Sequence, residues 1–241
     1  MDRQQSIRKY LDKNIPNDVI KKVLDAGRLA PSWVNVQPWH FIVVRKNKEI
    51  LSELSNNQPQ VRKADVVIVC VADTGAWDKE RFSEVLKQKG MNESGIDSLL
   101  QLPVLYPPLL GEQMTLLRTV EQVTYAIAYM TLEAEKQGLG ACVIGALGNE
   151  LTQILPELSE KVKHDLNLND RQVILAMLTL GYPDDNRETV KLRKDFDEVV
   201  SLEKMEEEHV RKVVDKCHGN ISKAAELLEI SRQRLYKKLG R

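Results

Sequence analysis

The chain has 241 residues, a length that suits one or two domains with a substantial buried core. Hydrophobic residues make up 42% and charged residues 29%, which excludes a disordered or low-complexity chain. Lys and Arg total 35 and Asp and Glu total 35, so the net charge is zero. Binding to a nucleic acid would therefore require a local basic patch.

Signals for secretion, membrane insertion and metal binding are missing from the sequence. The N-terminus MDRQQSIRKY has no apolar core, and no stretch reaches the ~18 apolar residues of a membrane span. We therefore expect a cytoplasmic location and no membrane partner. The three cysteines, Cys70, Cys142 and Cys217, and the four histidines lack metal-ligand spacing, so we expect no metal and reduced, packed thiols.

The first third of the chain mixes helical and strand patterns. Residues 17–30 carry apolar side chains at helical spacing, with Asn17 as the expected cap and Pro31 as the stop. Residues 40–45 and 65–72 are short β-branched runs that predict strands, and residues 47–55 between them have helical periodicity. This alternation predicts an α+β fold.

The middle of the chain predicts an excursion followed by the interior of the domain. Glycines and prolines interrupt residues 73–117, which we interpret as an irregular excursion that could serve as a lid. Its aromatic residues, Trp77, Phe82 and Tyr106, either line a pocket or, as we favour, pack in the core. Residues 120–134 are apolar on all faces and predict a central buried helix that ends at Gly138.

Two further interior strands and a change of composition follow. Residues 141–147 and 172–182 predict strands, separated by a helical segment at 149–163. We expect residues 190–200 to form an extended arm. From Leu202 three short helical patterns predict a separate all-α module, so we divide the chain into domains 1–200 and 201–241.

Three separated groups of motifs carry a family resemblance. They are SIRKY at residues 6–10; APSWVNVQPW at 30–39; and GLG at 138–140 with Ile144-Gly145, LGYP at 180–183 and the Lys191-Leu192-Arg193 arm. Together they resemble the nitroreductase family of FMN-dependent oxidoreductases over residues 3–200. The resemblance implies an α+β sandwich with a central mixed sheet flanked by helices. Two arginines usually precede the family's serine, whereas this chain has Gln4 and Gln5.

The resemblance also implies a cofactor site with no catalytic side chain, because FMN itself carries the hydride. Cationic side chains suit the flavin phosphate and the charge that builds on the reduced ring. The implied cofactor-binding residues are Ser6 and Arg8 at the ribityl-phosphate chain and pyrimidine edge, Lys191 and Arg193 at the phosphate, Asn57 at the pyrimidine ring, the backbone of Ile144, Gly145 and Ala146 facing flavin N5, and Pro31, Ser32 and Asn35 from a partner subunit. Taken singly, Arg8 is more often a solvated surface charge than a cofactor contact, and for Lys191 and Arg193 the alternative is a position on an exposed arm.

The C-terminal sequences GNISKAAELL, at 219–228, and ISRQRLYKKL, at 230–239, resemble a Fis-type helix-turn-helix. Ser231 is placed to cap the last helix, and Glu229 stands where the family usually has a glycine. The residues expected to face the major groove of DNA are Arg232, Gln233, Arg234, Lys237 and Arg241. A solvated helical appendage that docks on the enzyme or on another subunit is the alternative.

These features lead to one principal hypothesis. It is a homodimeric FMN enzyme that takes hydride from NADH or NADPH and reduces a small acceptor, such as a nitroaromatic or a quinone, by a ping-pong cycle. No dinucleotide-binding or phosphate-loop fingerprint is present, so NAD(P)H would be a transient donor. A flavin-dependent, redox- or ligand-sensing DNA-binding regulator is the alternative, and flavin fragmentation or reductive dehalogenation on a related fold also stays open.

Overall fold

The computed structural model describes residues 5–184, 193–200 and 202–240. The chain divides into two compact units, Met1–Thr189 and Val190–Arg241. This division precedes the boundary that the sequence places at residue 200. Each unit is described by itself below.

A four-stranded sheet forms the centre of the first unit. Its strands are β1 (Trp39–Val44), β2 (Val66–Asp73), β3 (Gly140–Ile144) and β4 (Gln172–Gly181), in the order β1-β2-β4-β3. The three strand pairs are antiparallel, and an isolated bridge between Ser6 and Ala141 adds a parallel contact at the outer edge of β3. The strands expected from the β-branched runs are confirmed, with ends that differ by a few residues.

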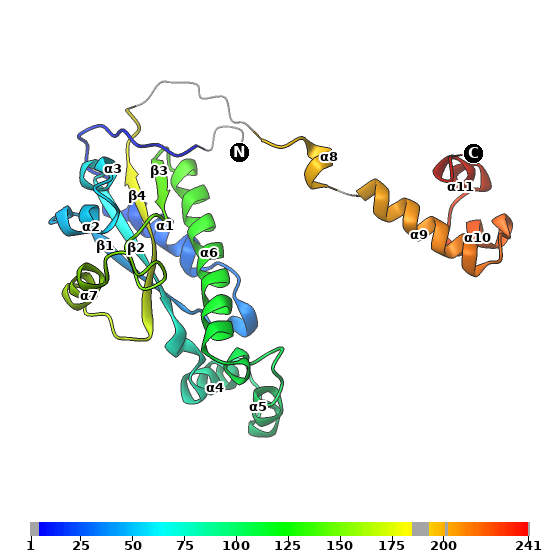
Figure 1. The fold of residues 1–241 in the computed structure, drawn as a ribbon, viewed down its shortest axis with the longest axis horizontal. Coiled ribbons are helices and arrows are strands. Elements are labelled where there is room, and N and C mark those ends of the chain that lie inside the picture. The colour runs from blue at the N-terminus through cyan, green and yellow to red at the C-terminus, as the bar shows by residue number, and fades with distance from the viewer. Residues whose placement is uncertain (1–4, 185–192, 201, 241) are drawn as a thin grey trace. The chain divides into compact units, whose positions relative to one another are not determined.

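Helices cover both faces of this sheet (Figure 1). One face packs against α1 (Asn17–Arg28) and α6 (Glu112–Lys136), and the other against α2 (Glu49–Leu54), α3 (Pro59–Lys63) and α7 (Pro156–Asp165). Successive strand side chains point to opposite faces, so Ile68 of β2 joins the first core and Val69 the second. Every residue of β2 is buried, which explains its continuous apolar sequence.

The excursion forms a third core and is more helical than we expected. It contains η2 (Thr74–Trp77), α4 (Lys79–Gln88), α5 (Glu93–Leu100) and η3 (Pro107–Leu110). Trp77 and Phe82 are almost fully buried, and the Phe82 ring stacks on Tyr106 with 5.8 Å between centroids. Trp77 and Phe82 therefore pack in the core, as we favour, and partly buried Tyr106 packs against it; Trp77 and Tyr106 also line a recess of about 610 Å³. Short apolar segments between glycines and prolines become helical here because they share one buried cluster.

Three helix predictions need correction. The residue at the N-cap of α1 is Pro16, without a side-chain cap, because Asn17 already lies in the helix. Helix α6 begins at Glu112 and is not buried all round, since Tyr125 is 44% exposed. Helix α7 begins at Pro156, after a loop where helix was expected. Periodicity placed these helices in the correct regions but did not fix their ends.

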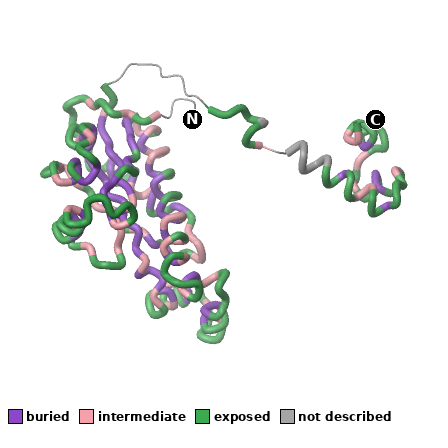
Figure 2. Tube along the Cα trace, in the orientation of Figure 1, coloured by how far each residue is buried: buried purple, intermediate pink, exposed green. Residues whose placement is uncertain are grey.

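The second unit contains α8 (Phe196–Val199), α9 (Leu202–Lys216), α10 (Ile221–Leu227) and α11 (Arg232–Lys238). The arm expected to be extended thus includes a short helix at 196–199. The side chains of Asn220 and Ser231 accept hydrogen bonds from the backbone N–H groups of Lys223 and Arg234, at 3.1 and 3.2 Å, which confirms Ser231 as a cap. The buried core is small: Val210, Cys217, Ala224, Ala225 and Leu235 (Figure 2).

Among the described residues, no helix is long and apolar enough to cross a membrane. Within the same residues, no group of three or more His, Cys, Asp or Glu side chains is arranged to hold a metal ion. Cys70, Cys142 and Cys217 are free and buried, as the sequence predicts.

Candidate functional site

The N-terminal segment runs along the end of the sheet and brings Ser6 and Arg8 to β3. The N–H of Ile7 donates to the Ala141 carbonyl at 2.9 Å, and the N–H of Leu11 donates to the Tyr182 carbonyl beyond β4 at 2.9 Å. Ser6 and Arg8 flank Ile7 and are both exposed. Alternation along this extended segment therefore packs half-buried Ile7 over Gly140 of the sheet and turns the two polar side chains outward.

The bridge to Ala141 places Ser6 beside β3, where Ser6 and Arg8 both act on the buried thiol of Cys142. Burial raises the pKa of the Cys142 thiol, while the nearby Arg8 charge and a hydrogen bond with Ser6 oppose this rise. Burial also raises the pKa of Tyr10, whose hydroxyl hydrogen-bonds with Thr179 Oγ1 and donates to the Ile7 carbonyl, both at 2.7 Å. These contacts hold the segment in place, so the Arg8 guanidinium is an exposed cation at a defined edge of the sheet.

Backbone donors lie open at the C-terminal end of β3. Gly145 and Ala146 are exposed, and a Cβ added at Gly145 would meet no atom within 4 Å. In the described part of the chain, the Ala146 N–H has no hydrogen-bond acceptor. An exposed backbone N–H of this kind can bind a carbonyl-bearing or anionic ring edge. Ile144, the last residue of β3, is buried beneath them.

Asn57 follows α2, the helix whose end is hydrogen-bonded to the loop after β3. The N–H of Gly148 donates to the Leu54 carbonyl of α2 at 2.8 Å, which joins the loop after β3 to the end of that helix. Asn57 follows three residues later, exposed and with a left-handed φ of 57° that asparagine tolerates well. Asn57 is therefore close in sequence to the point where α2 meets the loop after β3.

The segment that contains Pro31, Ser32 and Asn35 lies elsewhere in the same chain. The Trp33 N–H donates to Gln122 Oε1 of α6 at 2.7 Å, and the Arg118 guanidinium lies 4.8 Å from the centre of the Trp33 ring. This segment leads into the start of β1, where Trp39 pairs with Ala72 near the C-terminal end of β2. Ser6 is instead bridged to Ala141, which lies across β4 from Val66 at the N-terminal end of β2. A single chain therefore does not bring the two groups together.

The structure of the first unit does not place three of the residues expected to bind phosphate or DNA. Lys191 and Arg241 lie outside the described residues. Arg193 is described and exposed, but it belongs to the second unit. Their proposed contacts with phosphate and DNA stay predictions.

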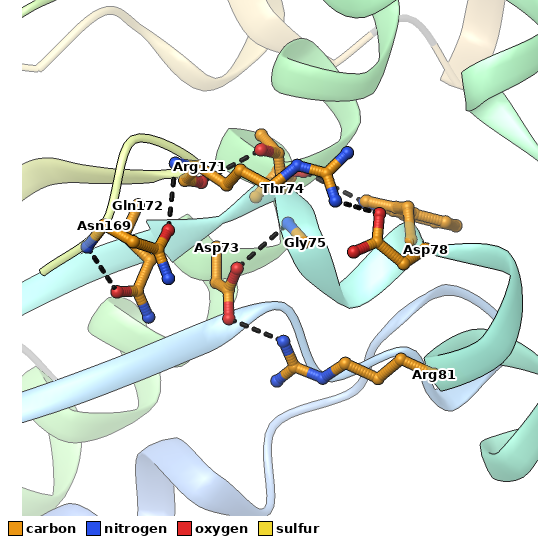
Figure 3. A network of polar contacts seen from close by, with 10 residues as sticks. Asp73, Thr74, Gly75, Asp78, Arg81, Asn169, Arg171 and Gln172 are labelled. Carbon is orange, nitrogen blue, oxygen red and sulfur yellow. Dashed lines mark hydrogen bonds and ion pairs between the residues drawn. The ribbon is translucent and has the colours of Figure 1, made fainter.

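A polar network that the sequence reasoning missed ties the ends of β2 and β4 to α4 (Figure 3). Asp73 accepts from the Gly75 N–H at 2.9 Å and forms an ion pair with Arg81 at 2.8 Å. Arg171 forms an ion pair with Asp78. The signal was present, because Asp73 and Asp78 each directly precede a helix, where aspartate commonly serves as a cap. The paired charges favour a structural role, although they border recesses of about 340 and 610 Å³.

In the second unit, the last helix presents the side chains expected to face DNA. Arg232, Gln233, Arg234 and Lys237 are all exposed on α11. Glu229 adopts a left-handed φ of 54° in the preceding turn, which explains why glycine suits that position. The recognition surface inferred from helical spacing is therefore accessible within its own unit.

Comparisons with known proteins agree with both resemblances. The model of the nitroreductase family matches residues 2–182, and the model described as "Bacterial regulatory protein, Fis family" matches residues 201–241. A Thermus thermophilus protein named NADH dehydrogenase is 28% identical over 183 residues, covering 75% of this chain and 83% of the relative. Bacillus subtilis FMN reductase (NADPH) is 28% identical over 181 residues, covering 74% of this chain and 62% of the relative.

Solved structures agree on the fold. A nitroreductase-like protein from Streptococcus mutans aligns with a TM-score of 0.69 at 23% identity, covering 82% of this chain and 93% of that protein. A nitroreductase family protein from Streptococcus pneumoniae aligns with a TM-score of 0.65 at 23% identity, covering 82% and 95% of the two chains. These likenesses concern the α+β fold of the first unit.

Proposed function

The chain belongs to the nitroreductase family, and on that premise we propose that it is an FMN-dependent oxidoreductase that transfers reducing equivalents from NAD(P)H to a small acceptor. Relatives named NADH dehydrogenase and FMN reductase (NADPH) support this reaction class. The observation that carries the proposal is that exposed Ser6, exposed Arg8 and the open backbone after β3 all accompany β3, an edge strand of the sheet. Quinones and nitroaromatic compounds are the acceptors we propose.

The residues of this edge fit a flavin. When bound, FMN supplies the hydride transfer, so the protein needs to bind and orient rather than to provide a nucleophile. Arg8 would stabilise negative charge at the polar edge of the ring, and the N–H groups at Gly145 and Ala146 would donate to its heteroatoms. Ser6 and Asn57 would add neutral hydrogen bonds, and Lys191 and Arg193 would bind the phosphate.

We propose that the active form is a homodimer, with Pro31, Ser32 and Asn35 of each chain completing the flavin site of the other. Two observations favour this arrangement. One chain keeps this segment apart from Ser6 and Arg8, and α6 exposes apolar side chains at multiples of four residues, namely Leu117, Tyr125 and Tyr129. Such a stripe on a long helix suits the self-complementary interface of a twofold dimer.

Flavin binding tests this proposal directly. Arg8→Gln removes the cation but keeps a donor, so we expect the Kd for FMN to rise about ten- to a hundredfold, as for loss of a charge-assisted hydrogen bond. Lys9→Gln is the matched control, because exposed Lys9 lies on the same segment, and its FMN affinity should stay within about twofold. Equal effects of both substitutions, or a chain that stays colourless with FMN, would overturn the assignment.

Turnover is tested with the flavin-loaded protein. We expect NADH or NADPH to be oxidised when a quinone or nitroaromatic acceptor is added, with parallel double-reciprocal plots that indicate a ping-pong cycle. Intersecting plots would reject that order of steps. Absence of turnover with both donors would reject the enzymatic function while leaving flavin binding intact.

Mixing two variants with weakened flavin sites tests the shared site. Arg8→Gln and Asn35→Asp impair contributions that we assign to different chains. A mixed dimer would contain one site with both native residues, and random exchange should restore about a quarter of the native sites. No recovery after confirmed subunit exchange would show that both residues act within one chain.

We propose DNA binding as a second function, carried by the C-terminal module and compatible with the first. The favouring observation is the exposed row Arg232, Gln233, Arg234 and Lys237 on α11, with Ser231 capping the helix. Fluorescence anisotropy at several salt concentrations should show one duplex bound more tightly than others, with affinity that falls as salt increases. Equal weak binding to every duplex would instead indicate an electrostatic or docking appendage.

A further inference from the structure

A basic recess lies at the opposite end of the N-terminal segment from Ser6 and Arg8. It has a volume of about 360 Å³ and is lined by residues 10–13, Arg45, Lys48 and residues 62–65. The segment crosses the end of the sheet: Ile7 bonds to β3, Leu11 bonds beyond β4, and the Ile15 N–H donates to Asp65 just before β2. The recess therefore lies at the β1–β2 side, and it shares no lining residue with the proposed flavin site.

The charge of the recess is strongly unbalanced. Five cations line it, Lys13, Arg45, Lys48, Arg62 and Lys63, against the two carboxylates of Asp12 and Asp65. Asp65 is already satisfied, since it accepts from Arg45 Nη1 and from the Ile15 N–H, both at 2.7 Å. The remaining positive charge faces only Asp12 within the lining, and Glu49, next to Lys48 and outside the lining, also acts on the Lys48 ammonium.

The cations are held in place mostly without acidic partners. Lys48 Nζ donates to the Ala64 carbonyl, and Lys13 Nζ lies 4.1 Å from the centre of the Tyr182 ring. In the described residues neither Arg62 nor Lys63 forms an ion pair. Burial lowers the pKa of Lys48 and the neighbouring Arg45 charge adds to this, while the carboxylates of Asp65 and Glu49 only partly oppose it. An anion in the recess would add to that opposing effect.

We propose that this recess binds a small molecule with two linked phosphate groups, such as a diphosphate ester. The excess of three cations in the lining matches the charge of about −3 that two phosphates carry near neutral pH. The volume is within the range of small-molecule sites, and the guanidinium of Arg62 can bind phosphate oxygens in a bidentate manner. A concave site of this size favours a compact anion over the backbone of a DNA duplex.

Isothermal titration of the FMN-loaded full chain with inorganic pyrophosphate tests the proposal. At constant ionic strength we expect one pyrophosphate per chain, without release of flavin, and much weaker binding of sulfate. The double variant Arg62→Gln/Lys63→Gln should weaken binding at least tenfold. The control Lys89→Gln/Lys161→Gln removes the same charge from exposed positions outside the recess, and its affinity should stay within about twofold.

Further titrations distinguish a nucleotide from other diphosphates, and a specific site from an effect of net charge. Binding of ADP with similar dependence on Arg62 and Lys63 would support a nucleotide as the ligand. Equal losses in the test and control variants would reduce the effect to net charge and overturn the site. Displacement of FMN by pyrophosphate, or binding of duplex DNA but not of pyrophosphate through Arg62 and Lys63, would also overturn it.

Discussion

The two units stabilise their helices by different means. In the first, α1, α2, α3, α6 and α7 pack on a sheet whose strand β2 is buried along its whole length. In the second, α9, α10 and α11 share one small cluster in which Ala224 and Ala225 permit close helix contact. A core of this size provides only a few kcal/mol, so single residues should determine whether the second unit folds.

The largest expected effect is from Leu235→Asp, because Leu235 is fully buried in the second unit. An unpaired buried carboxylate costs more than ~3 kcal/mol, so we expect the module to unfold while the melting midpoint of the first unit is unchanged. Amide NMR spectra and calorimetry would measure this. Leu227→Asp is the control, since Leu227 is 64% exposed. A lowered midpoint of the first unit would show that the two units are energetically coupled.

Trp77→Ala should strongly destabilise the first unit without unfolding it. The indole is buried and its Nε1 donates to Thr119 Oγ1 at 3.0 Å, so truncation should lower the free energy of unfolding by about 3–5 kcal/mol in denaturant titrations. Trp77→Phe removes the donor and retains most of the packing, and should cost about 1–2 kcal/mol. If both variants lose equal stability, the hydrogen bond rather than the ring volume dominates this core.

Asp73→Ala tests the polar network at the end of β2. The substitution removes the acceptor of the Gly75 N–H and the partner of Arg81, and we expect a loss of about 1–2 kcal/mol of unfolding free energy. Arg81→Ala should cost under ~1 kcal/mol, because the Arg81 side chain is 54% exposed. A larger loss from Arg81→Ala would show that the ion pair, rather than the cap, holds the strand end.

The smallest expected change is a stabilisation of the second unit. Glu229→Gly removes the strain of a left-handed φ at a non-glycine residue in the turn before α11. After the added chain entropy of glycine is subtracted, the free energy of unfolding should rise by about 0.5–1 kcal/mol. Glu226→Gly, in the helical part of α10, should instead destabilise the module by a similar amount. Chemical denaturation of the module would compare them, and a destabilising Glu229→Gly would disprove strain in the turn.

The sequence predicts much of each unit where local pattern decides the structure. The β-branched runs specify β2 and β4, and Ser231 specifies the start of α11, because strand burial and capping depend on neighbouring residues. The pattern fails where distant packing decides. Tyr125 is exposed on α6, although the apolar composition of residues 120–134 predicts burial on all faces. The excursion at residues 73–117 is helical because Trp77 and Phe82 share a buried cluster with later residues.

For the candidate flavin site, sequence motifs identify the residues, but only the fold shows which other residues lie beside them. Ser6 and Arg8 stand out by family resemblance, but only the bridge to Ala141 shows which strand they accompany. The basic recess left no motif, because Lys13, Lys48 and Arg62 are spaced irregularly along the chain. Side chains from distant segments converge only when backbone pairing brings those segments together.

By itself the sequence determined the family resemblance, the two-part organisation, the buried strands and the chemistry suited to a flavin phosphate. The tertiary structure alone decided that Ser6 and Pro31 lie at different ends of the sheet in one chain, and that five cations face one recess. The physical reason is that periodicity and capping act over a few residues, whereas long-range strand pairing and burial fix which distant side chains become neighbours.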